Sequence, residues 1–309
     1  MTEPMKVAYV FPGQGSQWVG MGRDLYDNFG LAKATFEQAD DVLGFPLSRL
    51  CFEGPEEELR LTSNAQPALI TVSYACLQAS SERNGLPSPA FVAGHSLGEY
   101  TALVAAGVLD FKTTVRLARE RGRLMHEASL NTPGGMMAVI GLDEKAMTEV
   151  CHETDTQIAN FNCPGQLVIS GAKENLPRAA DLAKIRGASR AIPLTVSGAF
   201  HTPFMQLAKN GMSQLIHSID FQDPTVPIIA NTTAQPLTTV DEVKTELLDQ
   251  LCNSVQWQRS IEYMANEGVS TFIEIGPGKV LSGLIKRINK NVDTLNKGDV
   301  ETIRSINAI

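Results

Sequence analysis

The sequence has no long hydrophobic run, no excess of basic residues and no secretion signal. Its 309 residues include 26 Lys and Arg against 34 Asp and Glu, a formal net charge of −8 at pH 7. Nucleic-acid-binding proteins normally carry a basic footprint, so this balance argues against a nucleic-acid partner. The most apolar stretch, 90–109, is interrupted by His95, Ser96 and Glu99, and the N-terminus lacks the features of a signal peptide. We therefore expect a cytoplasmic protein that does not span a membrane.

Cysteine and histidine are also sparse, at five residues each. The cysteines form no CxxC pair and the histidines no HExxH pair, so we expect incidental thiols in a reducing compartment and no metal site. Hydrophobic residues make up 43% and charged residues 19%, which predicts a sizeable core and argues against disorder. At about 150 residues per domain, the length predicts two domains, or one large domain with an insertion.

Short apolar runs alternate with helical patterns along the chain, which predicts an α/β fold. The runs are rich in β-branched and aromatic residues, as is typical of strands that are buried on both faces of a parallel sheet. These predicted strands are 6–11, 90–94 and 271–276. The predicted helices between them lie around 24–43, 66–84 and 97–107.

The stretch from about 134 to 198 has a different order of elements. It predicts strand, helix, strand, strand, helix, strand, which is the βαββαβ order of a ferredoxin-like unit. The strands are 136–141, 156–161, 166–171 and 190–196, and the helices are 143–153 and 173–187. We expect an inserted small subdomain, 131–198, within a large domain made of 1–130 and 199–309.

The pentapeptide GHSLG at 94–98 fits the G-x-S-x-G pattern directly between a predicted strand and a predicted helix. This context is typical of a nucleophile elbow, in which glycines tolerate the tight turn and the serine is exposed. It predicts Ser96 as a nucleophile and the N–H of Leu97 as a donor to an oxyanion. A chance match in a Gly-rich turn is the alternative, and lipases and thioesterases use similar pentapeptides.

A serine hydroxyl needs a base, and His201 is the best of the five histidines. It follows the last strand of the inserted unit, at a junction between domains where clefts commonly form. On a sharp turn the side chain of His95 should point away from that of Ser96, which favours a packing role. The alternative for His201 is a structural loop histidine.

Arg121 lies on the apolar stripe of a predicted helix over 110–128, which begins at Asp110. The other arginines of this helix fall on the opposite side and are expected to face solvent; they are Arg116, Arg119 and Arg123. A buried guanidinium needs a partner. One candidate is an acidic residue of the protein, and the other is a substrate carboxylate held by two hydrogen bonds.

Seven motifs in order resemble the malonyl-CoA:acyl carrier protein transacylases of type II fatty acid synthesis. They span nearly the whole chain and are specific as a set. They are FPGQGSQ (11–17), QPAL (66–69), GHSLGEY (94–100), Arg121 in RERGRLM, GAFH (198–201), VQW (255–257) and EIGPGKVL (274–281).

The resemblance implies a hydrolase-like α/β domain with a ferredoxin-like insertion, and a role for each matching residue. It implies that Ser96 is acylated and that His201 is its general base, oriented by the main-chain carbonyl of Gln256. The N–H groups of Gln14 and Leu97 would form the oxyanion hole.

The resemblance also implies the residues that hold the substrate. Arg121 would bind the malonyl carboxylate, and Gln66 would line the pocket, with Asn160 and Gln166 as further lining residues. Phe200, beside the base, would disfavour a methylmalonyl group.

The resemblance implies malonyl-CoA as a substrate, an acyl carrier protein as the partner and no cofactor, and we expect a monomer. The acidic carrier should dock on a local positive patch. The two candidate patches are Lys184, Arg186 and Arg190, or Lys286, Arg287 and Lys290.

Three alternatives stay open at this point. A polyketide pathway uses the same chemistry as fatty acid synthesis. A serine esterase or thioesterase uses the same elbow, but it would need an acidic residue between the serine and histidine in chain order and a histidine near the C-terminus. A non-catalytic carrier-protein scaffold is the third.

Overall fold

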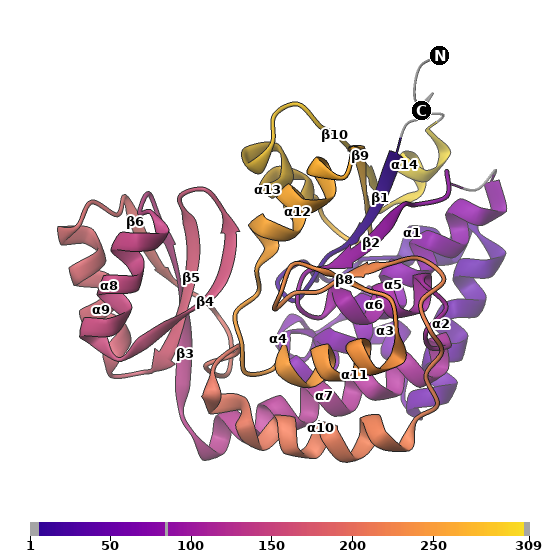
Figure 1. The fold of residues 1–309 in the computed structure, drawn as a ribbon. Helices are drawn as coiled ribbons and strands as arrows, with labels where there is room; N and C mark the ends of the chain where they lie inside the picture. The colour runs from indigo at the N-terminus through magenta and orange to yellow at the C-terminus, as the bar shows by residue number, and fades with distance from the viewer. Residues whose placement is uncertain (1–5, 84–85, 306–309) are drawn as a thin grey trace.

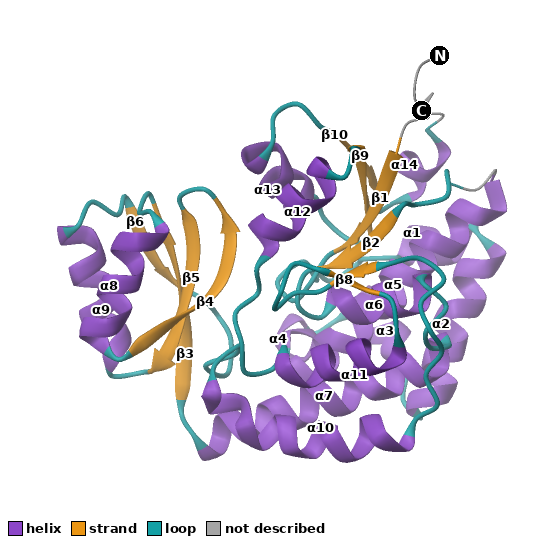
Figure 2. Ribbon diagram, in the orientation of Figure 1, coloured by secondary structure: helices purple, strands orange, loops and turns teal. Residues whose placement is uncertain are grey.

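The computed structural model describes residues 6–83 and 86–305, which form a large α/β part and a smaller lobe (Figure 1). Helices and strands alternate along most of the chain, which confirms the predicted α/β class (Figure 2). None of the helices in these two ranges is long and apolar enough to cross a membrane.

The central sheet has six strands in the order β10-β9-β1-β2-β7-β8. The pairs from β10 to β7 are parallel and β8 runs antiparallel to β7, so the predicted parallel central sheet is confirmed. The strands are β1 Lys6–Phe11, β2 Phe91–Gly94, β7 Ile228–Ile229, β8 Pro236–Leu237, β9 Val269–Ile275 and β10 Asp293–Lys297.

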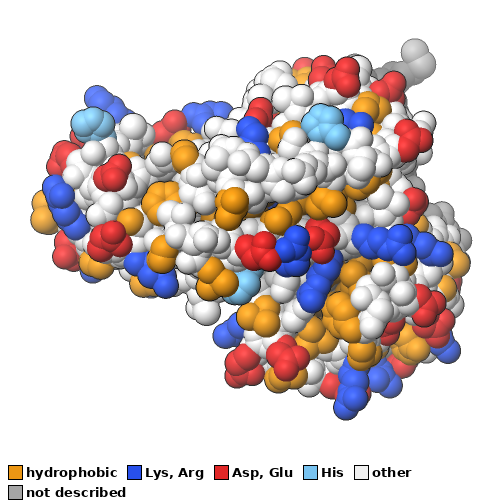
Figure 3. Space-filling view, turned by 90° about the horizontal axis from the view of Figure 1, so that it is seen from below, with side chains coloured by type: hydrophobic (Ala, Val, Ile, Leu, Met, Phe, Trp, Pro, Cys, Tyr) orange, Lys and Arg blue, Asp and Glu red, His pale blue; other side chains and the backbone are white. Residues whose placement is uncertain are grey.

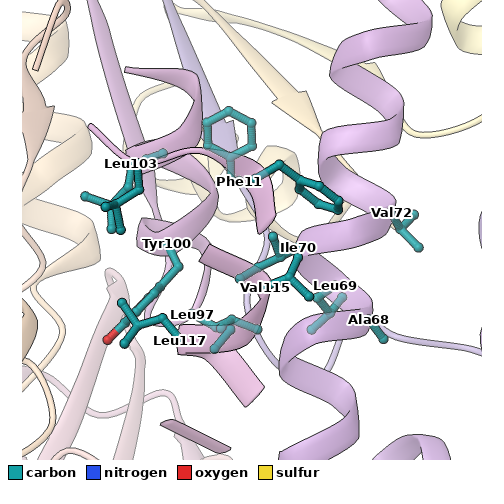
Figure 4. Packing of buried hydrophobic residues seen from close by; sticks show 14 of the residues in the cluster. Phe11, Ala68, Leu69, Ile70, Val72, Leu97, Tyr100, Leu103, Val115 and Leu117 are labelled. Carbon is teal, nitrogen blue, oxygen red and sulfur yellow. The ribbon is translucent and has the colours of Figure 1, made fainter. Parts of the chain in front are cut away.

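Both faces of this sheet are covered by helices. Along β1, Val7, Tyr9 and Phe11 enter one hydrophobic cluster, part of which Figure 4 shows, while Ala8 and Val10 enter another. The first cluster includes side chains of α5 Thr62–Arg83, α6 Gly98–Ala105 and α7 Phe111–Asn131. The second includes side chains of α12 Trp257–Asn266 and α13 Val280–Ile288. Burial on both faces explains why successive residues of these strands are apolar.

The remaining helices of the large part surround this core. They are α1 Arg23–Asn28, α2 Gly30–Leu43, α3 Leu47–Glu53, α4 Glu56–Arg60, the 3₁₀ turn η1 Pro203–Met205, α10 Gln206–Ser218, α11 Val240–Asp249 and α14 Val300–Arg304. The prediction of one helix over 24–43 is wrong, because Phe29 has an extended backbone that separates α1 from α2. Helix α5 begins at Thr62, before the predicted start at 66. Proline is commonest in the first turn of a helix, but Pro67 lies in the second turn of α5, so it did not mark the true start.

The small lobe has the element order β3, α8, β4, β5, α9, β6. Its four-stranded antiparallel sheet has the order β4-β5-β3-β6, and α8 and α9 pack against it around a separate hydrophobic cluster. The bounds are β3 Gly134–Ile140, α8 Glu144–Thr154, β4 Thr156–Cys163, β5 Gln166–Ala172, α9 Asn175–Ile185 and β6 Arg190–Pro193. Strand β6 ends earlier than the predicted 196, at a proline that has no N–H for the ladder.

Backbone and side-chain bonds fix the lobe to the large part. Val255 donates to Ala159 O at 2.8 Å and accepts from Phe161 N at 2.9 Å, which extends the edge of β4 into the large part. Arg259 of α12 forms an ion pair with Glu144 of α8 at 2.8 Å. Seen from below, the lobe projects from the large part, and side chains of both charge signs are interspersed over the two (Figure 3).

Candidate active site

Ser96 lies in a tight turn between β2 and α6. Its backbone has a φ of 51°, in the left-handed region that a non-glycine residue adopts reluctantly. The flanking glycines are required by close approach: a Cβ at Gly94 would lie 1.8 Å from the Gly98 carbonyl carbon, and one at Gly98 would lie 2.1 Å from the Phe11 oxygen. The turn therefore has the geometry of a nucleophile elbow.

His201 contacts the serine directly. Its Nε2 lies 2.8 Å from Ser96 Oγ, and its Nδ1 lies 2.8 Å from the main-chain oxygen of Gln250. Burial of the ring, and then the positive charge of Arg121, lower the pKa of His201 to about 3. The imidazole is therefore neutral at pH 7. Because a carbonyl oxygen only accepts, Nδ1 carries the proton and Nε2 accepts from the serine hydroxyl.

The expectation that Gln256 orients this histidine is wrong. The carbonyl of Gln256 accepts from the backbone and the hydroxyl of Ser260 at the start of α12, so it is already used within that helix. The carbonyl beside the imidazole belongs to Gln250, just after the end of α11. A main-chain acceptor leaves no residue-type signature, which is why the sequence did not distinguish the two glutamines.

Arg121 lies on the inward face of α7, with only 1% of its surface exposed. Its Nη1 donates to Gln66 Oε1 at 2.9 Å, and its Nη2 donates to Gln250 Oε1 at 2.7 Å. Nη2 also lies 3.4 Å from Ser96 Oγ. Among the described residues no carboxylate forms an ion pair with this guanidinium, and its Nε has no hydrogen-bond partner. The buried cation therefore lies beside the serine, held only by neutral groups.

Two expectations about neighbours of Arg121 need correction. Gln66 is completely buried and accepts from Arg121, and it is not among the residues that line the cavity, so it supports the guanidinium instead. Arg119 does not face solvent fully: it donates to Ser63 O at 2.8 Å and lies over the ring of Phe45. Its aliphatic stem and planar head allow this half-buried position.

Two backbone N–H groups are available near the serine. Gln14 follows the end of β1 and Leu97 follows Ser96, and both residues line the same cavity. In the described part of the chain neither N–H donates a hydrogen bond to another protein group. Donors of this kind can stabilise negative charge on a substrate oxygen.

The cavity in front of Ser96 has a volume of about 440 Å³ and lies between the large part and the lobe. Asn160, Gln166 and Phe200 line it, as expected. Asn160 Oδ1 is buried without a hydrogen-bond partner in the described part of the chain, whereas Gln166 Oε1 accepts from Arg287 at 2.6 Å. In the described ranges, no three His, Cys, Asp or Glu side chains gather in a way that could hold a metal ion.

Three polar residues that the sequence reasoning missed surround the elbow. Asn231 accepts from Ser96 N at 2.7 Å and donates to Gly94 O at 2.8 Å. The Gln250 side chain donates to Ser96 O at 3.0 Å, and both amides donate to the carboxylate of Glu99. Only Glu99 had a visible signal, since it is a lone acid in an apolar helix.

Residues 8–306 match the acyl transferase domain family. The chain belongs to this family. It is 48% identical over 303 residues to a malonyl CoA-acyl carrier protein transacylase of Bacillus subtilis, covering 96% of this chain and 95% of that protein. It is 46% identical over 292 residues to the enzyme of that name from Escherichia coli K12, covering 93% of each. A polyketide biosynthesis malonyl CoA-acyl carrier protein transacylase of B. subtilis is 45% identical, covering 94% of this chain and 99% of that protein.

Solved structures give the same relationship for this acyl transferase. An acyl carrier protein S-malonyltransferase from Vibrio cholerae has a TM-score of 0.93 and 41% identity, covering 98% of this chain and all of that one. A malonyl-transacylase solved in complex with a type II polyketide acyl-carrier protein also has a TM-score of 0.93 and 41% identity, covering 96% of this chain and 97% of that one. The hydrolase-like α/β fold class that the sequence resemblance implied is thus confirmed.

The hydrogen-bond partner of His201 differs from that of the histidine in a Ser-His-Asp hydrolase. The residue that accepts from His201 Nδ1 is a peptide carbonyl, not a carboxylate. A carboxylate there would stabilise the imidazolium, whereas a carbonyl orients the ring and leaves it less basic. This geometry weighs against the esterase alternative.

Proposed function

We propose that this acyl transferase moves the malonyl group from malonyl-CoA to the phosphopantetheine thiol of an acyl carrier protein, through a malonyl ester of Ser96. Arg121 carries this proposal: it is a buried cation without an acidic partner in the described chain, and its Nη2 lies 3.4 Å from the serine oxygen. A malonyl carboxylate would neutralise the positive charge of Arg121, whereas a neutral acyl group would leave the guanidinium unpaired.

In the first half-reaction, Ser96 Oγ attacks the thioester carbon while His201 Nε2 takes the hydroxyl proton. The N–H groups of Gln14 and Leu97 stabilise the oxyanion, each contributing about 10²–10³ in rate. The tetrahedral intermediate collapses, the carbon–sulfur bond breaks and the CoA sulfur takes the proton from His201. The products are the malonyl ester of Ser96 and free CoA.

In the second half-reaction, the carrier thiol is the nucleophile. His201 takes its proton, the sulfur attacks the ester carbon, and the serine oxygen leaves and recovers the proton. Malonyl-carrier protein is released and the enzyme returns to its starting state. The thioester that breaks is replaced by one that forms, so the chemistry needs no cofactor and malonyl-CoA is simply a substrate.

Residues from both parts would line the acyl and pantetheine path. We assign Phe200 to the space around the substrate α-carbon, and Asn160 and Gln166 to the wall on the lobe side. The proposal includes a division into two domains: a large domain made of 1–130 and 199–309, and an inserted small subdomain, 131–198. With this division, the cavity lies at the junction of the large domain and the small subdomain.

Of the two candidate carrier-docking patches, the structure favours the one with Arg287. Arg186 of the other patch is already paired with Glu149 at 3.4 Å and with Glu153. Arg287 instead contacts Gln166, which lines the cavity. Lys286 of this patch is paired with Asp293 at 3.5 Å, so the preference rests on the contact of Arg287 with the cavity residue Gln166.

Intact-mass measurement tests the function. With malonyl-CoA alone, the enzyme should gain one malonyl group that persists, and holo carrier protein should remove it. A Ser96→Ala variant should gain nothing. Rapid release of free malonate without carrier protein would instead indicate a thioesterase.

A polyketide pathway is the second candidate, because a polyketide transacylase is among the relatives at 45% identity. The transfer rates to a fatty acid carrier protein and to a polyketide carrier protein, measured side by side, separate the two. We expect the fatty acid carrier to be the better acceptor.

A further inference from the structure

Glu99 is a buried carboxylate that the transfer steps above do not use. It lies in the first turn of α6, three residues after the nucleophile, and only 1% of its surface is exposed. Its Oε1 accepts from the backbone N and from Nδ2 of Asn231, at 3.0 and 2.7 Å. Its Oε2 accepts from Gln250 Nε2 at 2.5 Å. Every group that faces this carboxylate through these bonds is therefore a donor.

The two amides that Glu99 contacts hold the reacting groups. Asn231 bonds to Gly94 O and to Ser96 N, on either side of the turn. Gln250 bonds to Ser96 O through Nε2 and to Arg121 through Oε1, and its main-chain oxygen orients His201. The turn, the base and the guanidinium thus meet at these two residues.

The orientation of both amides is fixed by what they contact. Each amide nitrogen faces a backbone carbonyl, and each amide oxygen faces a donor, either Ser96 N–H or Arg121. Burial and the charge of Glu246 raise the pKa of Glu99, and the donors from Asn231 and Gln250 act against that rise. The geometry favours the ionised form, because both carboxylate oxygens must accept at once, which a neutral amide cannot do. An amide at this position would place an NH₂ group against another NH₂ group.

Glu99 also acts on the charge of Arg121 without contacting it. Burial lowers the pKa of Arg121, and Tyr100 and the negative charge of Glu99 partly oppose this effect. The Gln250 amide lies between Glu99 and the guanidinium, which forms no ion pair among the described residues. A direct partner would compete with a substrate carboxylate, and this arrangement avoids that competition.

We propose that Glu99 is a positioning residue for malonyl transfer: its carboxylate locks the amides of Asn231 and Gln250, which set the nucleophile turn and hold Arg121 for the substrate carboxylate. This inference rests on the proposed function, because the selectivity that it explains is selectivity for malonyl.

Glu246 provides a matched control. It is also a buried carboxylate, with 4% of its surface exposed, and it accepts from the backbone and the hydroxyl of Thr232. Within the described chain its side chain makes no hydrogen bond to the side-chain amide of Asn231 or Gln250, although its negative charge raises the pKa of Glu99. Glu246→Gln therefore removes a buried charge that opposes ionisation of Glu99, and it leaves the donors to Glu99 in place. It should lower the melting temperature and leave the kinetics of acylation unchanged.

The experiment compares Glu99→Gln, Glu99→Asp and Glu246→Gln with the wild type in acylation by malonyl-CoA and by acetyl-CoA, per folded enzyme. We expect Glu99→Gln to lower kcat/KM for malonyl-CoA by about 10²-fold, as misplacement of reacting groups does. Acetyl-CoA should lose less, so the malonyl-to-acetyl ratio falls and KM for malonyl-CoA rises. Glu99→Asp keeps the charge and should retain more activity than the isosteric Glu99→Gln.

Several results would overturn the proposal. A malonyl-to-acetyl ratio in Glu99→Gln that equals the wild-type ratio would do so, as would an activity of Glu99→Asp below that of Glu99→Gln, which would indicate a volume-filling role. If Glu99→Gln does not fold, Glu99→Asp decides: aspartate keeps the charge but is too short to hold both amides, so its malonyl-to-acetyl ratio should fall below the wild-type ratio, and a ratio equal to wild type would overturn the proposal. Failure of the wild type to form malonyl-Ser96 would instead contradict the proposed function.

Discussion

The two parts of the molecule contribute different things to the cavity. The large part, with its sheet buried on both faces, supplies Ser96, His201, Arg121 and the Gln14 and Leu97 N–H groups. The small lobe, with α8 and α9 on its sheet, supplies wall residues such as Met136, Ala138, Val168 and Asn160. The groups that we propose for charge and proton transfer thus come from the large part, whereas both parts form the cavity wall, with Phe200 contributed by the large part.

This division follows from how each sheet is covered. Ser96 follows the end of the buried parallel strand β2 and Arg121 lies on the packed helix α7, while His201 lies in the turn before η1 and is held at 2.8 Å from both Ser96 Oγ and the Gln250 carbonyl. The sheet of the lobe forms one wall of the cavity, and its β4 edge is fixed to the large part by pairing with Val255. Substitutions in the two parts should therefore change different kinetic quantities.

The largest effect should come from His201→Ala. Without a base the serine hydroxyl keeps its proton, so the rate of Ser96 acylation should fall by about 10²–10⁴-fold. Rapid-quench measurement of malonyl-enzyme formation tests this, with Val168→Ala as the control from the lobe. If Val168→Ala slowed acylation as much as His201→Ala does, the proposed difference between the large part and the lobe would be contradicted.

Arg121→Ala should have the next largest effect, and a selective one. Loss of a buried charge-assisted partner costs roughly 2–5 kcal/mol, so kcat/KM for malonyl-CoA should fall by about 10²–10³-fold. Acylation by acetyl-CoA, which has no carboxylate, should be unchanged or faster. Competition between the two thioesters for one enzyme sample measures the ratio directly. If the variant kept its preference for malonyl, another group would have to bind the carboxylate.

The pH dependence of acylation should be shifted strongly toward acid. Burial and the charge of Arg121 lower the pKa of His201 to about 3 from its ordinary 6.5, and the neutral ring is the base. The rate should therefore be constant from about pH 8 to about pH 5 and fall only at lower pH. In Arg121→Ala one positive charge is gone, so the acid limb should move to higher pH, measured with acetyl-CoA. An acid limb near 6.5 in both enzymes would contradict this account.

Val168→Ala should have the smallest effect on malonyl transfer. The side chain is a buried wall residue of β5, so its truncation enlarges the cavity without touching the reacting groups. We expect kcat/KM for malonyl-CoA to stay near the wild-type value, while that for a bulkier methylmalonyl thioester rises by about tenfold. Parallel assays of both thioesters check this, and an unchanged ratio would place the specificity determinant elsewhere, with Phe200 the next residue to test.

Features with strong local patterns were predictable from the sequence. The runs 6–11 and 271–276 are continuously apolar because their strands are buried on both faces, and the stripe of α7 placed Arg121 inside. Strands β7, β8 and β10 were missed. The first two are only two residues long, and β10 is polar, so neither length nor periodicity marked them.

Within the site, residues that lie in or beside a distinctive motif were found, including Gln14 and Leu97 with their backbone N–H groups, whereas residues outside such motifs were not. The GHSLG pentapeptide, together with the predicted strand before it and helix after it, predicted the turn, and close approach of the backbone requires both of its glycines. Gln250 was missed in favour of Gln256 because its contact with His201 is a peptide oxygen, which any residue could supply. Asn231 is distant in sequence from everything that it contacts in the elbow, so only the fold brings it to Ser96.

Both reacting residues have backbones that ordinary side chains avoid: φ is 51° at Ser96 and 60° at His201. Glycine would relax either position, and it would remove the chemistry at the same time. Selection for stability and selection for turnover would therefore favour different residues at these two positions. A search for hardier variants would do best to hold both fixed and vary the lobe.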